Sequence, residues 1–507
     1  MAENTKDRSV IIIGAGFAGL AAGIYGQING YKTTIIEMHD KPGGLCTSWK
    51  RKGYTIDGCI HWLVGTNPRS AMHDFWEEVG LIQGRKCIDM DEYIHYECSD
   101  GRVLTFYCDI NRLEKELIRF SPGDEDQIRK FIRGITLSMR FDMPSKNSSF
   151  TEKLFRKLRL YSTFLTKGRE MQTWMKVTGK EFAAGFKDPE LRTAFDEIWI
   201  PEFSIFFMFF AFAYLHRKNA GYPLGGSMPM SEALEEQYKK LGGNLIYRKR
   251  VTKILTDKGK AAGVCLDDGQ EYRSDIVISA ADGYNTIFKM LEGKYADDKI
   301  RHIYDNWIPF HPLLFIGLGV NRRFDEIPIS VSGFSFPLRE EVVIGDKTRS
   351  RLPVHLYHHD PSLAPEGRTT LTIMLDTSYD YWKNLHADKK EYENKKEEVS
   401  KTVISLLEQR FPGISSQVEM VDVATPVTFE RYTGNWKGSF EGWLITPDNA
   451  NTIMKPLSQT LPGLDDFYMC GQWVEPGGGL PTGVMSARRL FKTICRKDGK
   501  KFRTHVA

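Results

Sequence analysis

The chain has 507 residues, of which 41% are hydrophobic and 26% are charged. This composition supplies a buried core and excludes a largely disordered protein, and the length predicts about two to four domains. The 69 basic and 65 acidic residues leave a net charge of only +4. A nucleic-acid-binding protein usually shows a clustered basic excess, so we expect no nucleic-acid partner.

Eight cysteines are scattered along the chain, without a C-x-x-C pair or the spacing of a zinc site. We therefore expect no metal and no disulfide framework, and a reducing, cytoplasmic setting. Residues 1–9 are polar and lack the apolar core of a signal peptide. The longest apolar run, residues 203–215, is shorter than the roughly 20 residues that cross a bilayer.

The first informative segment reads as strand, glycine turn and helix. The β-branched run 10–13 is typical of a strand that is buried on both faces. Gly14 permits the tight turn that follows, Gly16 lets backbone N–H groups approach a pyrophosphate, and Gly19 lets the helix pack closely on the strand. The spacing predicts a dinucleotide site at the start of this helix.

A second predicted strand, Lys32 to Ile36, ends in Glu37. An acidic residue about 20 positions after the glycines is suited to a ribose hydroxyl, which indicates an unphosphorylated adenosine ribose. These residues alone do not separate NAD from FAD.

Two further motifs follow directly: Lys41-Pro42-Gly43-Gly44-Leu45, and Gly58 to Trp62 with the sequence GCIHW. With them the chain resembles the phytoene desaturase, carotenoid isomerase and retinol saturase family of FAD enzymes. The resemblance continues through Tyr222 to Met228, Val251, and Asp275 to Ala281, and ends in Cys470-Gly471-Gln472-Trp473 and the PGGGLP segment before Val484. It departs from the family at Gln472, where many relatives have an acidic residue.

The resemblance implies FAD as the cofactor and assigns its binding to residues in all of these segments. They are Gly14, Gly16, Phe17, Ala18, Gly19, Glu37, Gly43, Gly44, Leu45, His61, Trp62, Val251, Ala280, Gly471, Gln472, Gly478, Gly479, Leu480 and Val484. Val251 is expected to present backbone to the adenine, and the last motif to direct a helix N-terminus at the flavin carbonyls.

We therefore expect an α/β protein with a discontinuous, glutathione-reductase-like Rossmann-type domain and an α+β substrate domain with a mixed or antiparallel sheet. The FAD-binding domain is predicted to comprise residues 1–100, 225–295 and 455–507, and the substrate domain residues 101–224 and 296–454. Within them we expect a helix at 229–241, an antiparallel meander over 239–282, strands at 313–320, 354–358, 369–375 and 418–427, and a surface helix at 389–408.

Two segments are candidates for membrane contact. Residues 153–165 combine basic and bulky apolar side chains, as in a helix that lies on an anionic membrane, and the alternative is a helix that covers the substrate domain. The apolar run 203–215 either lines a lipid tunnel or belongs to the core. The expected location is cytoplasmic or peripheral on the inner face of a membrane.

Candidate acid or base residues near the flavin motifs are His61 and Glu475, for which a structural histidine and an exposed loop carboxylate are the alternatives. Cys46 has no adjacent base and is interpreted as a packing residue. The pair His358-His359 lacks the further ligands of a metal site.

The predicted function is oxidation, reduction or isomerisation at carbon–carbon bonds of a long apolar substrate, carotenoid, retinoid, isoprenoid or fatty acyl, with FAD carrying the redox step. Because the sequence has no second GxGxxG in a strand-to-helix context, a quinone, oxygen or a redox protein is the expected electron partner. A flavin amine oxidase-like enzyme and a non-catalytic flavin-containing lipid-binding protein are the alternatives.

Overall fold

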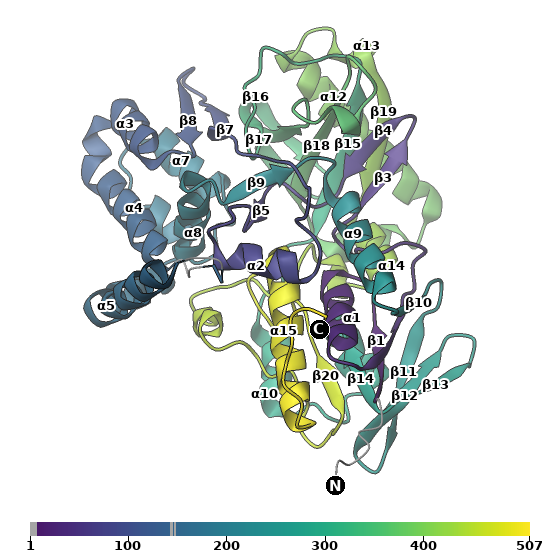
Figure 1. The fold of residues 1–507 in the computed structure, drawn as a ribbon. Coiled ribbons are helices and arrows are strands. Elements are labelled where there is room, and N and C mark those ends of the chain that lie inside the picture. Colours follow the sequence, from purple (N-terminus) through teal and green to yellow (C-terminus); the bar gives the residue numbers. More distant parts are fainter. Residues whose placement is uncertain (1–7, 142–144, 147–148, 507) are drawn as a thin grey trace.

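The computed structural model describes residues 8–141, 145–146 and 149–506 and shows an α/β protein (Figure 1). Its central layer is a parallel sheet, in the order β10 (Asn244–Ile246), β2 (Lys32–Ile36), β1 (Ser9–Ile13), β14 (Ile276–Ser279) and β20 (Phe467–Met469). The five strands come from three distant parts of the sequence, residues 9–36, 244–279 and 467–469. The discontinuous Rossmann-type layer expected from the sequence is confirmed.

Both faces of this sheet are covered, as continuous apolar strands require. On one face lie α1 (Phe17–Ile28), α9 (Ser227–Lys240) and α15 (Gly479–Lys497), which share a core with Val10 and Ile12 (Figure 1). On the other face, Ile11 and Ile13 share a core with a three-stranded antiparallel sheet. That sheet consists of β11 (Val251–Asp257), β12 (Lys260–Leu266) and β13 (Glu271–Arg273).

The predicted meander over 239–282 is thus confirmed in its middle and wrong at its ends. Strand β10 pairs with β2 and strand β14 pairs with β1, so both belong to the parallel sheet. The sequence pattern could not separate them, because all of these strands are short apolar runs between turn residues.

The second large layer is a seven-stranded mixed sheet. Its order is β19 (Val418–Ala424), β15 (Leu313–Val320), β18 (Thr369–Asp376), β17 (Lys347–Leu356), β16 (Phe334–Ile344), β7 (Glu92–Glu97) and β8 (Val103–Tyr107). Neighbours are antiparallel except β16 and β7, which are parallel. The predicted surface helix is α12 (Lys389–Arg410), whose apolar side packs on this sheet.

One predicted strand of this layer is too long. The run 418–427 is a strand only to Ala424, and α14 (Pro426–Thr433) begins directly after it. Pro426 has no N–H for a sheet ladder but suits the first turn of a helix, and Thr425 caps that helix.

Two small sheets connect the layers. Strands β3 (Ser48–Arg51) and β4 (Tyr54–Asp57) pack on the seven-stranded sheet, while β9 (Ala220–Pro223) lies between β5 (Leu63–Val64) and β6 (Cys87–Ile88). Strand β7 lies in the seven-stranded sheet although it falls in the first segment assigned to the FAD domain. The domain boundaries stay a prediction.

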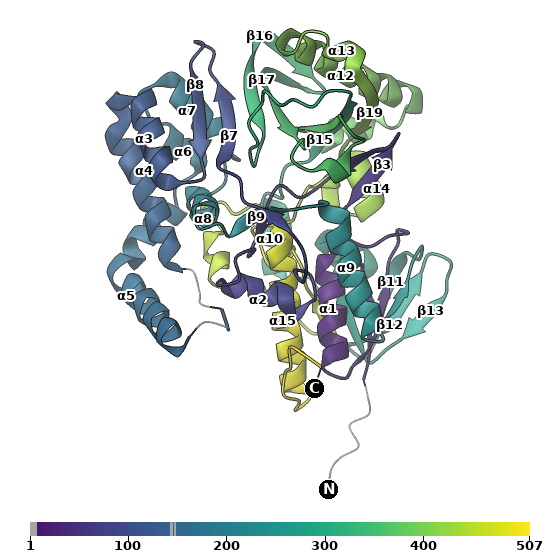
Figure 2. The same ribbon diagram turned by 45° about the horizontal axis from the view of Figure 1, so that its top comes forward.

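A group of helices flanks the two layers and is seen most clearly in Figure 2. It comprises α3 (Ile110–Phe120), α4 (Glu125–Ser138), α5 (Phe150–Met175), α6 (Gly179–Ala183), α7 (Pro189–Glu197) and α8 (Ile205–His216). The remaining helices are α2 (Ala71–Glu78), α10 (Asp298–Asn306), α11 (Tyr379–Leu385) and α13 (Ile414–Gln417).

The apolar helix α8 is packed inside this group against α4, α5 and α6, and most of its side chains are buried. Most of the run 203–215 is therefore covered by protein, and its contact with a membrane stays a prediction. No helix among the described residues is long and apolar enough to cross a membrane.

The contact of α1 with β1 gives a stability prediction. A Cβ added to Gly19 would lie 1.9 Å from the carbonyl oxygen of Gly14, so Gly19→Ala must displace backbone. We expect the free energy of unfolding to fall by about 1–3 kcal/mol, measured by urea denaturation. The control is Gly123→Ala, where nothing lies within 4 Å. An equal effect of the two substitutions would contradict the prediction.

Candidate functional site

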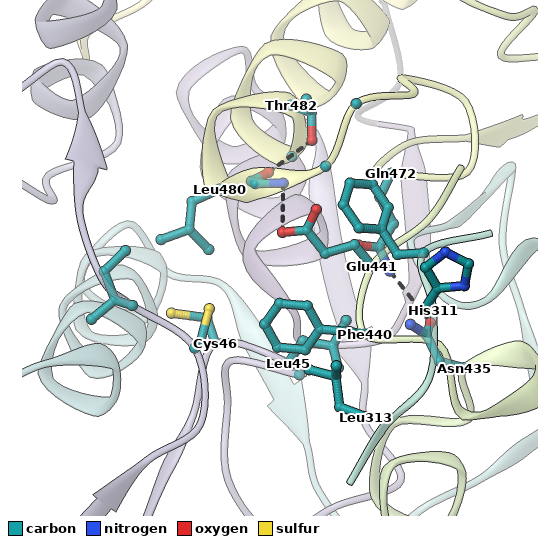
Figure 3. A pocket seen from close by; sticks show the side chains of 18 of the residues that line it. Leu45, Cys46, His311, Leu313, Asn435, Phe440, Glu441, Gln472, Leu480 and Thr482 are labelled. Carbon is teal, nitrogen blue, oxygen red and sulfur yellow. Dashed lines mark hydrogen bonds between the residues drawn. The ribbon is translucent and has the colours of Figure 1, made fainter. Parts of the chain in front are cut away.

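A cavity of about 1250 Å³ extends between the parallel sheet, the seven-stranded sheet and α8. One part of its wall is formed by glycine-rich turns at the starts of α1 and α15, and another part by aromatic side chains of α8 and its neighbours. Figure 3 looks into the part between these regions.

Backbone approaches backbone at the first glycine turn. Gly14 adopts a positive φ of 95°, and its N–H donates to the carbonyl of Ile36 at 2.8 Å. The Gly43 N–H donates to the carbonyl of Ala15 at 2.9 Å, which places the second glycine motif against the first. Helix α1 begins at Phe17, and no side chain of the described residues caps it. Its first N–H groups are therefore available to an anionic ligand.

Glu37 lies at the end of β2 and lines the cavity. Its carboxylate accepts hydrogen bonds from the backbone N–H of Ala15 at 2.6 Å and of His39 at 2.8 Å. These bonds fix the carboxylate at the glycine turn. Its predicted contact with a ribose stays a prediction.

Val251 and Ala280 line the same part of the cavity. Val251 begins β11 and is buried, and Ala280 directly follows β14. The Ala280 carbonyl lies 3.6 Å from the place where a Gly14 Cβ would stand, so these loops are in close contact.

The third glycine turn opens α15. Gly477, Gly478 and Gly479 all have positive φ, and the Gly479 N–H donates to Oε1 of Glu441 at 3.0 Å (Figure 3). A Cβ on Gly478 would lie 1.5 Å from Oε2 of Glu441, so this position accommodates only glycine while the carboxylate is there. Leu480 and the two residues of the preceding motif, Gly471 and Gln472, also line the cavity.

Glu441 is a residue that the sequence analysis missed. It lines the cavity near Gln472 and Phe440, and burial raises the pKa of its carboxyl to about 7, against the opposing effect of the Gly479 N–H (Figure 3). No motif surrounds Glu441 in the sequence, and only its tertiary contact with the α15 turn reveals it. A carboxyl with this pKa exchanges protons readily near neutral pH.

His61 lines the cavity, as do Gly43, Gly44, Leu45 and Trp62 of the two motifs around it. Its ring stacks on the buried ring of His355, with centroids 4.5 Å apart and planes 13° apart. Burial lowers the pKa of His61 to about 4 and also lowers that of His355, so both imidazoles are neutral at pH 7. The sequence alone could not pair His61 with His355, because the two residues lie far apart in the chain.

Three predicted site residues do not line the cavity: Gly19, Val484 and Glu475. Gly19 serves the packing of α1, and Val484 lies on the buried side of α15, in the core. The Glu475 carboxylate pairs with Arg489 at 2.8 Å, which holds it away from the cavity. The predicted role of Glu475 as an acid or base is therefore not supported by its position, and it is also not the exposed carboxylate of the alternative interpretation.

The aromatic part of the wall is formed by Trp62, Tyr93, Trp199, Phe203, Phe206, Phe207, Phe210, Tyr214 and Phe310. Neighbouring rings contact each other, for example Phe203 and Phe207 with centroids 4.6 Å apart. Run 203–215 was expected either to line a lipid tunnel or to belong to the core, and it does both. One side of α8 lines the cavity and the other side, with Met208 and Phe212, fills the core.

Among the described residues, no group of three or more His, Cys, Asp or Glu side chains could hold a metal ion. His359 is buried against Tyr222, while His358 Nε2 lies 3.1 Å from the carbonyl of Ile327. Cys46 is buried and also lines the cavity, next to Leu45 (Figure 3).

Comparison with known proteins agrees with this geometry. Residues 17–490 match the model of the family described as flavin containing amine oxidoreductase. A prolycopene isomerase from an Oncidium hybrid cultivar is 26% identical, and the match covers 96% of this chain and 84% of the relative. A phytoene desaturase (neurosporene-forming) from Rhodobacter capsulatus is 23% identical over 97% of this chain and 95% of the relative.

Among solved structures, an oxidoreductase from Methanosarcina mazei has the same fold with a TM-score of 0.59. The identity is 19%, and the match covers 96% of this chain and 100% of the other. The family match extends over nearly the whole chain: it begins at Phe17, directly after the first glycine turn, and includes the two later glycine turns of the cavity. The chain therefore belongs to the family of flavin-containing amine oxidoreductases.

Proposed function

We propose that this chain is an FAD-dependent oxidoreductase acting on carbon–carbon bonds of a long apolar unsaturated molecule, a carotenoid, retinoid, isoprenoid or fatty acyl chain, as a saturase, desaturase or isomerase. The observation that carries the proposal is the cavity, in which three glycine turns share a wall with a dense aromatic lining. The names of the prolycopene isomerase and phytoene desaturase relatives support the same substrate class.

The residues at the glycine turns fit FAD. The open N-terminus of α1 suits a pyrophosphate, the Glu37 carboxylate suits a ribose, and Val251 suits the adenine. The start of α15, where only glycine is accommodated, suits the flavin ring. When bound, FAD accepts or donates a hydride.

The chain's own residues orient the substrate, exclude water and transfer the proton. The aromatic lining binds the apolar substrate and excludes water, which strengthens electrostatic effects inside the cavity. Glu441 takes up or releases the proton, and we assign it to Oε2 because Oε1 accepts the Gly479 N–H. His61 is neutral and forms part of the wall, held in place by His355.

A quinone, oxygen or a redox protein is the electron partner in this proposal, and the protein acts in the cytoplasm or at the inner face of a membrane. An amine oxidation is the second candidate. Its support is the carboxylates of Asp196 and Glu202, which line the cavity and would attract a cationic amine.

Cofactor binding can be tested at Glu37. Glu37→Gln replaces the carboxylate that we assign to a ribose hydroxyl with a neutral amide, and a hydrogen bond to a charged group is worth about 1.5–3 kcal/mol. We expect FAD to bind at least about tenfold more weakly, measured by titration of the apoprotein. The exposed Glu366→Gln is the control. FAD affinity unchanged by Glu37→Gln would argue against this site.

The pH dependence of turnover tests Glu441. Because the pKa of this carboxyl is about 7, it is protonated below pH 7 and ionised above it. If Glu441 accepts the proton, as in desaturation, the rate rises through pH 7, and if it donates the proton, as in saturation, the rate falls there. We expect Glu441→Gln to lower turnover by about 10²-fold and to abolish this transition.

Two control variants separate Glu441 from its neighbours. Glu475→Gln should keep the transition, because Glu475 lies outside the cavity lining. Asp282 also lines the cavity, and burial raises its pKa to about 7, but its carboxylate accepts backbone N–H groups of Asn285 and Trp436. A transition that persists in Glu441→Gln and disappears in Asp282→Asn would transfer the role to Asp282.

The reaction itself is tested by mass spectrometry of products from a panel of carotenes, retinoids, unsaturated fatty acids and amines. The protein is incubated with its flavin oxidised in one arm and reduced in the other. A gain of two hydrogen atoms indicates a saturase, a loss of two a desaturase, and an altered retention at unchanged mass an isomerase. Turnover of amines alone would overturn the proposal in favour of amine oxidation. Absence of any product, together with a flavin spectrum that no panel member changes, would favour a lipid-binding protein.

A further inference from the structure

Two of the eight cysteines are neighbours in the wall of the cavity. Cys46 follows the second glycine motif and Cys59 belongs to the GCIHW motif, and both line the cavity as free cysteines. Cys46 is buried, whereas Cys59 is half-buried. In the sequence they stand in separate motifs, so only the fold reveals that they form a pair.

The hairpin of β3 and β4 sets the register that brings them together. Ser48 of β3 pairs with Asp57 of β4. The Gly58 N–H donates to the carbonyl of Thr47 at 3.0 Å, which continues the antiparallel ladder by one step beyond the strands. The next pair in this register consists of the two cysteines.

The two cysteines occupy a position of the ladder that has no hydrogen bonds across it. The Cys46 N–H donates to the carbonyl of Gly43 at 3.0 Å, and the Cys59 N–H donates to Oδ1 of Asp57 at 2.9 Å. At such positions the Cα atoms of opposite residues are about 4.5 Å apart. A disulfide spans Cα separations of about 4.4–6.8 Å. The register therefore places the two cysteines at a separation that a disulfide can bridge.

Contacts with α9 place the same two segments together independently of the register. The Cys46 thiol donates to the carbonyl of Ser227 at 3.7 Å. The Ser227 hydroxyl donates to Oδ1 of Asp57 at 2.6 Å and accepts the N–H of Ile60 at 3.1 Å. One residue of α9 thus contacts the thiol of Cys46 and both sides of the segment that carries Cys59.

The electrostatics of Cys59 agree with this placement. Its pKa is raised well above the usual range, first by the Cys46 side chain, then by burial and by the carboxylates of Asp57 and Glu441. Because the thiolate is the reactive form, the raised pKa keeps Cys59 a thiol at neutral pH and makes its exchange reactions slow.

Small solutes can reach the pair through the cavity. Thr348, Ser350 and Tyr432 line the cavity and are exposed, so the cavity opens to solvent. Cys59 is the more accessible of the two sulfur atoms, and Cys46 lies behind it as a second thiol. This arrangement suits thiol–disulfide exchange, in which one thiol reacts first and its neighbour completes the reaction.

We propose that Cys46 and Cys59 form a reversible dithiol–disulfide pair in the cavity wall, which low-molecular-weight disulfides oxidise and low-molecular-weight thiols reduce. The Cys59 thiolate attacks a sulfur of the external disulfide, whose S–S bond breaks and releases one thiol. Cys46 then attacks the Cys59 sulfur, the new S–S bond forms, and the second external thiol leaves. The pair loses two electrons and two protons, and the external disulfide gains them as two thiols.

The new bond would close the hairpin at its open end and join the segment of Gly44 to the segment of His61, both of which line the cavity. Exchange of the two electrons with bound FAD rests on the proposed function, whereas formation of the disulfide does not.

The test is equilibration of the full-length, FAD-loaded protein with glutathione disulfide and glutathione at several ratios, without substrate. Free thiols are then blocked with iodoacetamide, and the protein is digested with trypsin. Because trypsin does not cut before Pro42, it releases the peptides 33–50 and 53–69, each with one cysteine of the pair. We expect mass spectrometry to show these two peptides linked, lighter by two hydrogen atoms than their sum, and dithiothreitol to separate them again.

Single substitutions test the roles of the two thiols. Cys46→Ser and Cys59→Ser should each abolish the linked peptides, and in Cys46→Ser we expect Cys59 to retain one glutathione. The matched control is Cys265→Ser, which removes another half-buried cysteine, on β12 outside the cavity lining. This control should form the linked peptides like the unchanged protein.

The proposal is overturned if both cysteines stay blocked by iodoacetamide in excess glutathione disulfide, if Cys46 links to Cys87 instead, or if the linked peptides appear only after denaturation. Each of these results would leave the two cysteines as packing residues. The decisive peptides come from the unchanged protein, so the result does not depend on the folding of a variant.

Because this measurement needs no substrate, its failure would leave the product panel unaffected. Conversely, a protein that forms the disulfide and converts no member of the panel would retain the thiol pair and lose the proposed chemistry.

Discussion

The close approach of backbone to backbone at the glycine turns is the constraint on which the rest of the structure depends. The carbonyl of Gly14 occupies the space that a side chain at residue 19 would need, and the Gly43 N–H bonds to the carbonyl of Ala15. These contacts bring the first two motifs together above the parallel sheet. Without them, the N-terminus of α1 would not face the cavity, and Glu37 would have no turn to bind.

Burial acts on the titratable groups of the cavity in opposite directions, as it must when it disfavours every charged form. It raises the pKa of Glu441 and lowers that of His61. A carboxyl that is half protonated at neutral pH and an imidazole that stays uncharged therefore share one apolar site. This difference separates a group that can exchange a proton from one that shapes the wall.

The cavity lies where two layers meet, and neither layer forms it alone. The parallel sheet contributes the glycine turns, and α8 contributes aromatic side chains with one side while the other side fills the core. Helix α5 packs on α8, and its side chains Leu158 and Leu165 are exposed. Its place in the fold thus connects the surface of the protein with the lining of the cavity.

The sequence by itself determined the strand, glycine turn and helix around residues 10–25, the position of Glu37, and the positions of α9 and α12. These features depend on local spacing, since a turn or an amphipathic face is encoded within a few neighbouring residues. The same reasoning identified the glycine motifs that meet at the cavity. It extended the strand at 418 too far and assigned β10 and β14 to the meander, because short apolar runs do not reveal their pairing partners.

Only the tertiary structure decided which polar groups reach the cavity and which apolar faces remain exposed. Glu441 meets the turn at Gly479, and His61 stacks on His355, across separations of 38 and 294 residues that no local pattern spans. Glu475 lies near the right motif and yet pairs with Arg489. Runs 153–165 and 203–215 both suggested membrane contact. Packing buried most of 203–215 and left most side chains of 154–165 exposed, because burial is a property of the assembled core and not of the segment.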